Sequence, residues 1–548
     1  MSARSSSLQR RRATLATSLI LAVTFAAYLP SLQNGFTNWD DPYYVTGNPA
    51  IRSLSWPAFK LIFSSSVLGQ YHPLSVLSFA GDYRFFGLDP RGYHTVNLAL
   101  HLANTLLVFG VVRLLCGSLT AALAGSLLFG VHPLHVESVA WVAERKDLLC
   151  ALFFFGALGA YLRHTRAARS GAWYVLALLL LAASLLAKPM GVTFPLVLYL
   201  CDYLLERPWG WRTHLEKLPF IALALLFVAL TLSPPGLPRP EQLPLRFTVD
   251  NLFVAAYGLI FYLGKAIFPV RLSALYPYPE TTAAPLPWRF LLAPVPAVLL
   301  GLAVLRSARV ARIVPFGALF FTCTLLPVLA VRIGPHFAAD RYFYLPSFGL
   351  CYLVGIGFSR LFDGAGHSTR VRAAALAALA FATIAFSLLT WRQTRVWRDT
   401  LILWDDVIAT YPEPSVAYLS RGLERFERGD AEGSVGDLTV YLRISPFEAS
   451  AYKARGTALL KAGRGLEALG DFDRAVSLRP DYAEALNNRG ALLAGRGELA
   501  RAIDDFTRAL NANPRYRMAL VNRAKARETL GDSAGAAADL EKAGALEP

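Results

Sequence analysis

The chain has few cysteines and few charged residues for its length. Of 548 residues, five are cysteines and 17% are charged. The cysteines lie in or next to apolar runs, none follows Cys351, and no Cys-x-x-Cys spacing occurs, so neither a disulfide framework nor a cysteine metal site is predicted. Hydrophobic residues make up 55%, and the mean hydropathy of +0.40 is too high for one soluble globule. This composition predicts a membrane protein of two or more domains.

The formal net charge of +16 is unevenly distributed along the chain. Residues 411–548 hold 20 basic and 20 acidic residues, so the whole excess lies in residues 1–410, beside the apolar runs. Basic loops next to apolar runs are typical of segments that face a cytoplasm and anionic lipid. A nucleic-acid-binding protein would concentrate positive charge on its soluble part, so nucleic acid is not a predicted partner.

Twelve apolar runs near the length needed to cross a bilayer occur between residues 13 and 391. The first could be a signal peptide, but its length and the similar runs that follow favour an uncleaved membrane helix. Basic residues at 10–12 put the N-terminus in the cytoplasm. Two successive cytoplasmic loops must be joined by an even number of crossings, but three apolar runs lie between the basic loops 207–217 and 306–312. Of these three runs, 249–268, which contains Lys265, is expected not to cross the membrane fully. About eleven crossings then leave the C-terminus outside. The later cytoplasmic loops are those at 163–169, 207–217, 306–312 and 360–372.

With this orientation, most of the unusual polar residues share the outer face of the membrane. The first outer loop spans 31–94 and is the longest. Charged residues at membrane depth are costly and usually line a cavity or a pathway. The other predicted outer segments are 132–147, 187–190, 234–248, 268–280 and 334–343.

The pattern changes after residue 392, where small residues and prolines repeat every 34 residues. This period is the signature of tetratricopeptide repeats (TPRs), in which glycine and alanine stand where two helices cross closely. We therefore predict a membrane domain over 1–391, a connector over 392–411 and four TPRs over 412–548, with a concave surface for a protein partner. The series are Pro412, Pro446, Pro480, Pro514 and Pro548; Gly422, Gly456, Gly490 and Ala524; Gly429, Gly463, Gly497 and Gly531; and Ala468, Ala502 and Ala536.

Two adjacent acids, Asp40 and Asp41, stand in the first outer loop within the stretch FTNWDDPYYVTGNP. A carboxylate at a membrane surface can act as a general base on an acceptor hydroxyl or amide, or can help to hold a divalent cation. Since Asp before Pro is common in turns, a helix cap or a solvated turn is the alternative explanation.

A second polar stretch, VHPLHVESVAWVAERKD, lies between two apolar runs. His132, His135 and Glu137 could form a metal site, but Pro133 breaks the helical spacing and no HExxH motif is present. A polar interface loop with helix-capping acids is the alternative. The stretch also holds Glu144, Arg145, Lys146 and Asp147.

Three cations stand at the predicted outer helix ends: Lys188, Lys265 and Arg341. Gathered around one cavity, they would suit a lipid phosphate, whose charge needs Arg or Lys partners. Taken singly, each could instead extend its charged end to the membrane interface.

In order along the chain, these stretches resemble the GT-C glycosyltransferases. They resemble more closely the transmembrane and TPR-containing (TMTC) O-mannosyltransferase-like proteins and their bacterial relatives. Two departures, His72 in Tyr-His-Pro and Pro189 after the lysine, match the bacterial branch of that family. The stretches that carry the resemblance are NWDDPYYVTGNPAI, HPLSVLSF, FGLDPRGYHTVNLALH, FGVHPLHVESVAWVAERKDLL, LLAKPMGVTFPLVLYLCDYLL, YLGKAIFPVRLSALYPYP and ADRYFYLPSFG.

The resemblance implies an all-α protein, with a polytopic GT-C-like membrane domain followed by a TPR α-solenoid. It implies transfer of a sugar, with inversion, from a polyprenyl-phosphate-linked donor to an outer acceptor, which could be a glycan or the Ser/Thr hydroxyls of a protein. One acid of the pair would be the base, with Asp41 preferred. Basic residues would stabilise the departing phosphate, first Arg341, then Lys188 and Lys265. Further site candidates are His72, His132, His135, Glu137, Arg145, Asp147 and Tyr342.

These expectations describe a multi-pass enzyme of a bacterial inner membrane, with a cytoplasmic N-terminus and periplasmic TPRs that bind the acceptor or a partner. No cofactor is assigned, a divalent cation is left open, and the polyprenyl-phosphate-linked sugar is the donor substrate. A non-enzymatic membrane-anchored TPR scaffold is one alternative. A transporter or lipid flippase is another, and it predicts charges near mid-membrane in broken helices.

Overall fold

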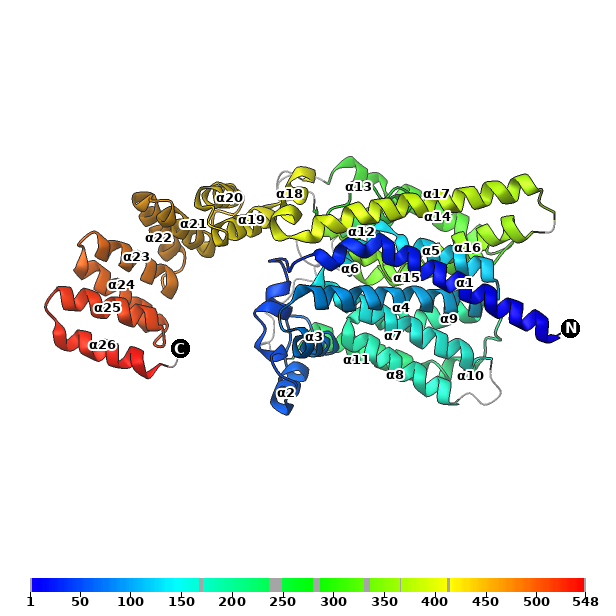
Figure 1. Ribbon diagram of the computed structural model, residues 1–548, viewed down its shortest axis with the longest axis horizontal. Coiled ribbons are helices and arrows are strands. Elements are labelled where there is room, and N and C mark those ends of the chain that lie inside the picture. Colours follow the sequence, from blue (N-terminus) through cyan, green and yellow to red (C-terminus); the bar gives the residue numbers. More distant parts are fainter. Residues whose placement is uncertain are drawn as a thin grey trace. The chain divides into compact units, whose positions relative to one another are not determined.

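The computed structural model describes residues 2–166, 171–235, 249–278, 286–329, 336–364, 366–411 and 414–546, with side chains from residue 9 onward and without that of Val249. Arg169 of one basic loop, Pro412 and Pro548 lie outside the described residues, as do parts of the loops 234–248, 268–280 and 334–343. The chain forms two compact units, Met1–Leu403 and Trp404–Pro548. This division falls inside the predicted connector. Figure 1 shows both units as helical throughout, apart from one small strand pair.

The first unit is a bundle of long apolar helices. Its central helix, α7 (Arg145–His164), packs against α4 (Pro90–Cys116) and α8 (Gly171–Ala187). Helix α4 shows how the sequence sets its ends: the Asp89 carboxylate accepts the Arg91 amide at 3.0 Å, and Gly117 ends the helix with φ +72°. The other long elements are α1 (Ser2–Tyr28), α5 (Leu119–Val131), α9 (Phe194–Leu204), α11 (Leu218–Leu232), α12 (Val249–Ile267), α14 (Pro294–Ser307), α15 (Ile313–Leu329), α16 (Ser347–Asp363) and α17 (Thr369–Thr394).

Shorter elements form the ends of this bundle. Strands β1 (Tyr276–Pro277) and β2 (His336–Ala338) pair antiparallel. The remaining helices of the first unit are α2 (Trp56–Ser64), α3 (Pro73–Phe86), α6 (Val136–Ala140), α10 (Trp211–Leu215) and α13 (Trp288–Leu292), with single turns at η1 (Leu29–Gln33), η2 (Pro42–Thr46), η3 (Pro49–Ile51), η4 (Pro133–His135), η5 (Val142–Glu144), η6 (Pro189–Thr193), η7 (Asp340–Phe343) and η8 (Arg395–Arg398).

Six segments within the described residues are long and apolar enough to cross a membrane, and a seventh arises if α5 and the segment 133–140, bent by 55°, count as one. Helix α12 is not one of the six, while α8, the segment 189–204 and α15 are apolar but shorter. These segments make the chain a multi-pass membrane protein by length and composition, and the predicted all-α fold class is confirmed. The count of eleven crossings stays a prediction.

The loop 31–94 lies at the end of the bundle opposite the N-terminus. In Figure 1, α2 and α3 stand at one end of the first unit, and the start of α1 and helix α10 stand at the other. Since α10 belongs to a predicted cytoplasmic loop, this arrangement agrees with the predicted separation of the two kinds of loop.

The second unit begins within α18 (Thr400–Thr410) and continues as four helix pairs whose starts are 34 residues apart. The turns inside the pairs carry Gly429, Gly463, Gly497 and Gly531, with φ between +77° and +91°, which only glycine adopts easily. A Cβ on Gly456 or Gly490 would lie 2.8 Å from a phenylalanine ring atom of the facing helix. The pairs are α19 (Ser415–Glu427) with α20 (Ala431–Ile444), α21 (Ala449–Lys461) with α22 (Gly465–Leu478), α23 (Ala483–Gly495) with α24 (Leu499–Ala512), and α25 (Arg517–Thr529) with α26 (Ser533–Ala545).

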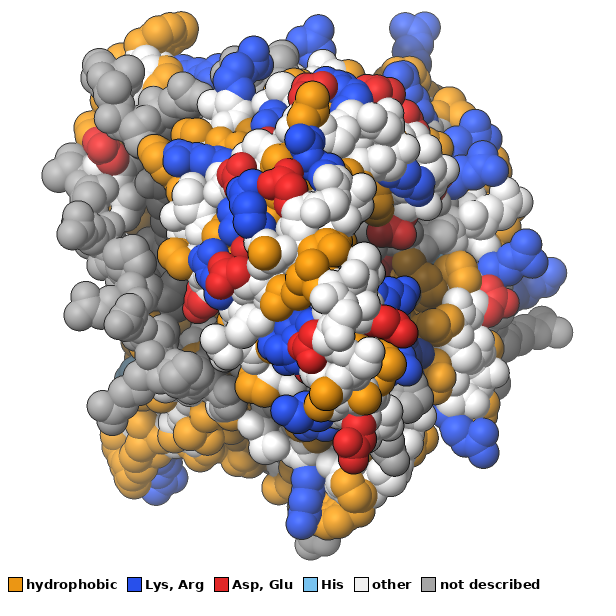
Figure 2. All heavy atoms as spheres, turned by 90° about the vertical axis from the view of Figure 1, so that its left-hand side faces the viewer, with side chains coloured by type: hydrophobic (Ala, Val, Ile, Leu, Met, Phe, Trp, Pro, Cys, Tyr) orange, Lys and Arg blue, Asp and Glu red, His pale blue; other side chains and the backbone are white. Residues whose placement is uncertain are grey.

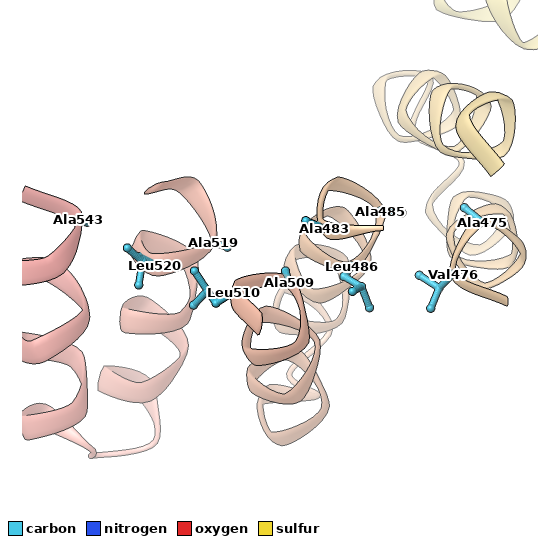
Figure 3. Packing of buried hydrophobic residues seen from close by; sticks show 10 residues of the cluster. All are labelled: Ala475, Val476, Ala483, Ala485, Leu486, Ala509, Leu510, Ala519, Leu520 and Ala543. Carbon is cyan, nitrogen blue, oxygen red and sulfur yellow. The ribbon is translucent and has the colours of Figure 1, made fainter. Parts of the chain in front are cut away.

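Small and branched apolar residues fill the space between successive pairs, as Figure 3 shows for Val476, Leu486, Leu510 and Leu520. Each pair is also joined by a partly buried arginine–aspartate bridge whose partners are 16 residues apart. In the second pair, for example, Arg455 donates from Nε and Nη2 to Asp471 at 2.8 and 2.7 Å. Figure 2 shows one face of the molecule, on which basic and acidic side chains are interspersed.

Candidate active site

Asp40 and Asp41 are neighbours in sequence but occupy different environments. The Asp41 side chain is fully buried. One of its oxygens accepts the Thr37 amide at 2.7 Å and the Thr37 hydroxyl at 3.1 Å, and the other accepts the Ala143 amide at 2.9 Å. Burial raises the pKa of Asp41 to about 7, against the opposing effect of these hydrogen bonds. Asp41 therefore fastens the loop 31–94 to η5.

Asp40 is the accessible acid of the pair. Its side chain keeps 20% of its surface exposed, and its Oδ2 lies 3.5 Å from Nζ of Lys146. The backbone around it is fixed, because its carbonyl accepts the amides of Tyr43 and Tyr44 at 3.0 and 3.1 Å as η2 begins. The geometry thus favours Asp40 over Asp41 as the group that can reach a substrate.

Lys146 connects Asp40 to a larger group of charges centred on Glu144. Glu144 Oε1 lies 3.0 Å from Nζ of Lys146 and 3.4 Å from Nε of Arg341, and its Oε2 lies 3.2 Å from Nζ of Lys188. Lys188 also reaches Asp147 at 2.7 Å. Arg341 forms a second ion pair with Glu137, whose other oxygen accepts the Arg341 amide at 2.9 Å. We call these residues the Asp40 cluster: Asp40, Glu137, Glu144, Lys146, Asp147, Lys188 and Arg341.

Six separate chain segments build this cluster. Asp40 comes from the first loop, Glu137 from α6, and Glu144 from η5. Lys146 and Asp147 lie on the first turn of α7, Lys188 directly precedes η6, and Arg341 lies in η7. All six segments belong to the loops that the sequence analysis assigned to one face. Six of the seven side chains are at least nine-tenths buried, and Asp40 is the most exposed.

Aromatic rings cover the cluster on the side of Arg341. Trp39 stacks on Trp141 at 4.7 Å, and the Arg341 guanidinium lies 4.9 Å from the centre of the Tyr342 ring. Tyr342 shares a hydrogen bond of 3.2 Å with His336, which also lies 3.2 Å from Nη2 of Arg341. Burial and the nearby Arg341 charge lower the pKa of His336 to about 3, so its ring is neutral. These rings therefore pack against the charged groups and help to bury them.

The remaining candidates lie outside the cluster. Arg145 points away from its neighbour Lys146, to Asp82 at 2.5 Å and to Oδ1 of Asn97 at 2.7 Å. Lys265 donates to the carbonyls of Val270 and Arg271 at 2.6 and 3.0 Å, so it closes the turn after α12.

His72 lies beside η2, where its Nδ1 shares a hydrogen bond of 3.1 Å with the Tyr44 hydroxyl. Lys146 Nζ lies 4.8 Å from the centre of that Tyr44 ring. His72 therefore contacts the cluster through Tyr44.

His132 and His135 use their ring nitrogens for structural contacts. His132 Nε2 lies 3.1 Å from the Ala266 carbonyl, and its Nδ1 accepts the Leu134 amide at 3.2 Å. His135 bridges the Phe129 carbonyl at 2.9 Å and the Ser347 hydroxyl at 3.0 Å. Within the described residues, no group of three His, Cys, Asp or Glu side chains is arranged to hold a metal ion.

Sequence reasoning noticed Glu144 and Lys146 as charged residues but gave them no role, and it missed His336, Trp39 and Trp141. Their one sequence signal is position: each lies in a stretch that carries the family resemblance or just before one. Which side chains of those stretches face one another depends on the path of the loops.

The fold and the site together define a multi-pass helical membrane protein with a TPR array and a buried charge cluster at one end of its bundle. A tetratricopeptide-repeat family model matches residues 483–516. Over 191 residues the chain is 36% identical to protein O-mannosyl-transferase Tmtc1 of Drosophila melanogaster, covering 33% of this chain and 22% of that protein. Over 428 residues it is 26% identical to TMTC4 of Homo sapiens, covering 67% of this chain and 57% of that protein.

The chain is thus similar to the TMTC protein O-mannosyl-transferases, and the resemblance to TMTC proteins seen in the sequence is confirmed. The matched part spans about a fifth to somewhat over half of these curated relatives. Among solved structures, the TPR protein YrrB is 23% identical, with a TM-score of 0.26 over 31% of this chain and 87% of that chain.

Proposed function

We propose that this protein transfers a sugar from a polyprenyl-phosphate-linked donor to an acceptor hydroxyl, with Asp40 as the general base. The observation that carries the proposal is the position of Asp40. It is the exposed edge of a buried cluster that also holds Lys146, Lys188 and Arg341. The similarity to O-mannosyl-transferases supports glycosyl transfer as the reaction class.

The reaction is a single displacement at the anomeric carbon. The acceptor oxygen forms a bond to that carbon while its proton passes to Asp40, and the bond from the carbon to the phosphate oxygen breaks. The electron pair of that bond leaves with the polyprenyl phosphate, which gains one negative charge. No enzyme nucleophile takes part, so the configuration at the anomeric carbon inverts.

The leaving phosphate needs cations near the base. The three cations of the cluster contact carboxylates, and Lys188 and Arg341 each keep about a tenth of the side chain exposed. A bound phosphate would share these cations with Glu144, and the attraction grows as charge develops on the leaving oxygen. Arg341 and Lys188 are therefore assigned to the phosphate, and Lys146 to Asp40.

Asp41 acts as a positioning residue in this proposal. Both of its oxygens accept amide hydrogens, so it holds the loop rather than the substrate. The sugar is proposed to be mannose by analogy with the relatives, and the acceptor a Ser or Thr hydroxyl of a protein. The reaction is assigned to the outer face of a bacterial inner membrane, with the TPR unit on the same side to hold the acceptor or a partner.

The test is the activity of purified full-length Asp40→Asn protein with polyprenyl-phosphate-mannose and a threonine peptide. We expect a loss of at least about 100-fold in kcat, as is usual when a general base is removed. Asp89→Asn is the matched control, because Asp89 is an exposed acid of the same loop and Asn also caps helices well.

Full activity of Asp40→Asn would refute the assignment of the base. A wild-type protein that binds partners but transfers no sugar would support the scaffold alternative. Movement of the lipid donor across a vesicle without transfer would support the flippase alternative.

A further inference from the structure

A cavity of about 330 Å³ lies beside the acid pair in the loop 31–94. Its walls come from η2 and η3, helix α2, the turn after α2 and the start of α3. In Figure 1 these elements lie together at the end of the bundle away from the N-terminus. The residues that line the cavity include Pro42, Ser66, Leu68, His72 and Val76.

A chain of side-chain contacts connects the cavity to the Asp40 cluster. His72 lines the cavity and shares its hydrogen bond of 3.1 Å with Tyr44. Nζ of Lys146 lies 4.8 Å from the centre of the Tyr44 ring and 3.5 Å from Oδ2 of Asp40. His72 and Tyr44 thus lie between the cavity and Lys146, the cation next to the proposed base.

The chemistry of the walls excludes a phosphate and favours an apolar group. The lining residues, all within the described part of the chain, include no Asp, Glu, Lys or Arg. A lipid phosphate would therefore find no cation there. Apolar side chains surround the opening, where Tyr43 is 58% exposed and Leu61 and Leu68 are each 47% exposed.

The size of the cavity limits what can enter. Pockets for small molecules span about 300 to 1,000 Å³, and this cavity lies at the lower end of that range. It has room for one large side chain but not for a whole polyprenyl chain. A tight turn shapes the outer wall, in which Leu68 has φ +50° and Val67 and Gln70 exchange hydrogen bonds of 3.0 and 2.9 Å.

We propose that this cavity binds an apolar side chain of the acceptor polypeptide, close to the Ser or Thr whose hydroxyl meets Asp40. This inference rests on the proposed glycosyl transfer and specifies its acceptor as a polypeptide segment with a large apolar residue near the modified hydroxyl. Burying such a side chain corresponds to a preference of about 10- to 100-fold over alanine.

The first experiment fills the cavity. Purified full-length protein receives polyprenyl-phosphate-mannose and one of two peptides, which carry a single Thr and either Phe or Ala at a neighbouring position. The wild type is expected to prefer the Phe peptide by about tenfold or more in kcat/KM. Ser66→Trp should abolish that preference by raising KM for the Phe peptide, while kcat/KM for the Ala peptide and KM for the donor stay unchanged.

Ser64→Trp is the matched control, because Ser64 is exposed two residues away and does not line the cavity. It should retain the preference for Phe. If the wild type shows no preference at any of the neighbouring positions, or if Ser66→Trp keeps it, the inference is wrong.

A binding experiment separates this inference from the proposed function. The Asp40→Asn protein is exposed to the same peptide with a photoreactive benzoyl-phenylalanine in place of Phe, and mass spectrometry locates the cross-link. A cross-link within residues 42–76 supports the inference even if no sugar transfer is ever detected. A cross-link to other segments, no cross-link, or labelling of 42–76 by a photoreactive polyprenyl phosphate overturns it.

Discussion

Helix α7 carries a charge cluster at each of its ends, and the two clusters are built differently. At its first turn lies the Asp40 cluster. Near its last turns, Tyr161 contacts a second group in which Arg207 pairs with Asp202 at 2.9 Å and with Glu216 at 3.0 Å. Lys217, whose side chain is fully buried, pairs with the other oxygen of Asp202. We call Asp202, Arg207, Glu216 and Lys217 the Asp202 cluster.

The Asp202 cluster is local and balanced. Its four charged residues lie within 16 residues of one another in the chain, and two carboxylates face two cations. The Asp40 cluster joins segments up to 301 residues apart (40 to 341), and four carboxylates face three cations. A local, balanced group is suited to holding adjacent helices together, whereas an unbalanced group with one exposed carboxylate is suited to exchanging a partner for a substrate.

The largest expected effect comes from Asp202→Asn. This change leaves Lys217 buried without a carboxylate, and breaking a buried pair typically costs about 3 to 5 kcal/mol of folding free energy. Thermal unfolding in detergent should show a large fall in Tm, while the protein that remains folded keeps the wild-type kcat. Glu206→Gln is the control, because Glu206 is 70% exposed in its pair with Arg312 at the same end. If Asp202→Asn lowered kcat without lowering Tm, the assignment of a purely structural role to the Asp202 cluster would be wrong.

Lys146→Met should lower kcat strongly and Tm only slightly, which is the reverse of the pattern expected for Asp202→Asn. Asp40 would still reach solvent, and Glu144 would keep Lys188 and Arg341, so we expect a smaller loss of stability than in Asp202→Asn. Since Asp40 would lose the cation that holds it in place, kcat should fall about 100-fold, which corresponds to about 2.7 kcal/mol. Lys60→Met, at an exposed lysine of α2, should change neither quantity. An unchanged kcat in Lys146→Met, measured with the same donor and peptide, would contradict the role given to Lys146.

The sequence could predict much of the fold because its signals are periodic. The glycines at the TPR turns recur every 34 residues, and the structure confirms why: each has a positive φ. The arginines of the intrapair bridges recur with the same period, but sequence reasoning passed over them. They became visible only when Arg489 was seen to meet Asp505 across two helices, at 2.6 Å.

The candidate site was less predictable because its contacts are not periodic. Sequence reasoning gathered the right loops at one end, but it could not tell that Lys146 meets Asp40 while the adjacent Arg145 meets Asp82. Two neighbours on a helix point about 100° apart, so their partners depend on the loop that covers them. The same limit applies to the preference for Asp41, since only the loop path reveals that its oxygens are occupied by Thr37 and Ala143.

The smallest effect, and the one that separates the two acids most directly, concerns pH. Asp41 has a pKa of about 7 in the folded protein against 3.8 for the free group. Between these values the folded state keeps a proton that the unfolded state has lost, so stability is greatest at low pH and falls as pH rises toward 7. From pH 5 to 7 this amounts to about 2 kcal/mol. Asp41→Asn cannot ionise, so its Tm should lose this pH dependence relative to the wild type and to Asp89→Asn.

Because Asp41 positions the loop without taking a proton from the acceptor, Asp41→Asn should retain at least tenfold more activity than Asp40→Asn. If Asp41→Asn were less active than Asp40→Asn, Asp41 would be assigned as the general base instead.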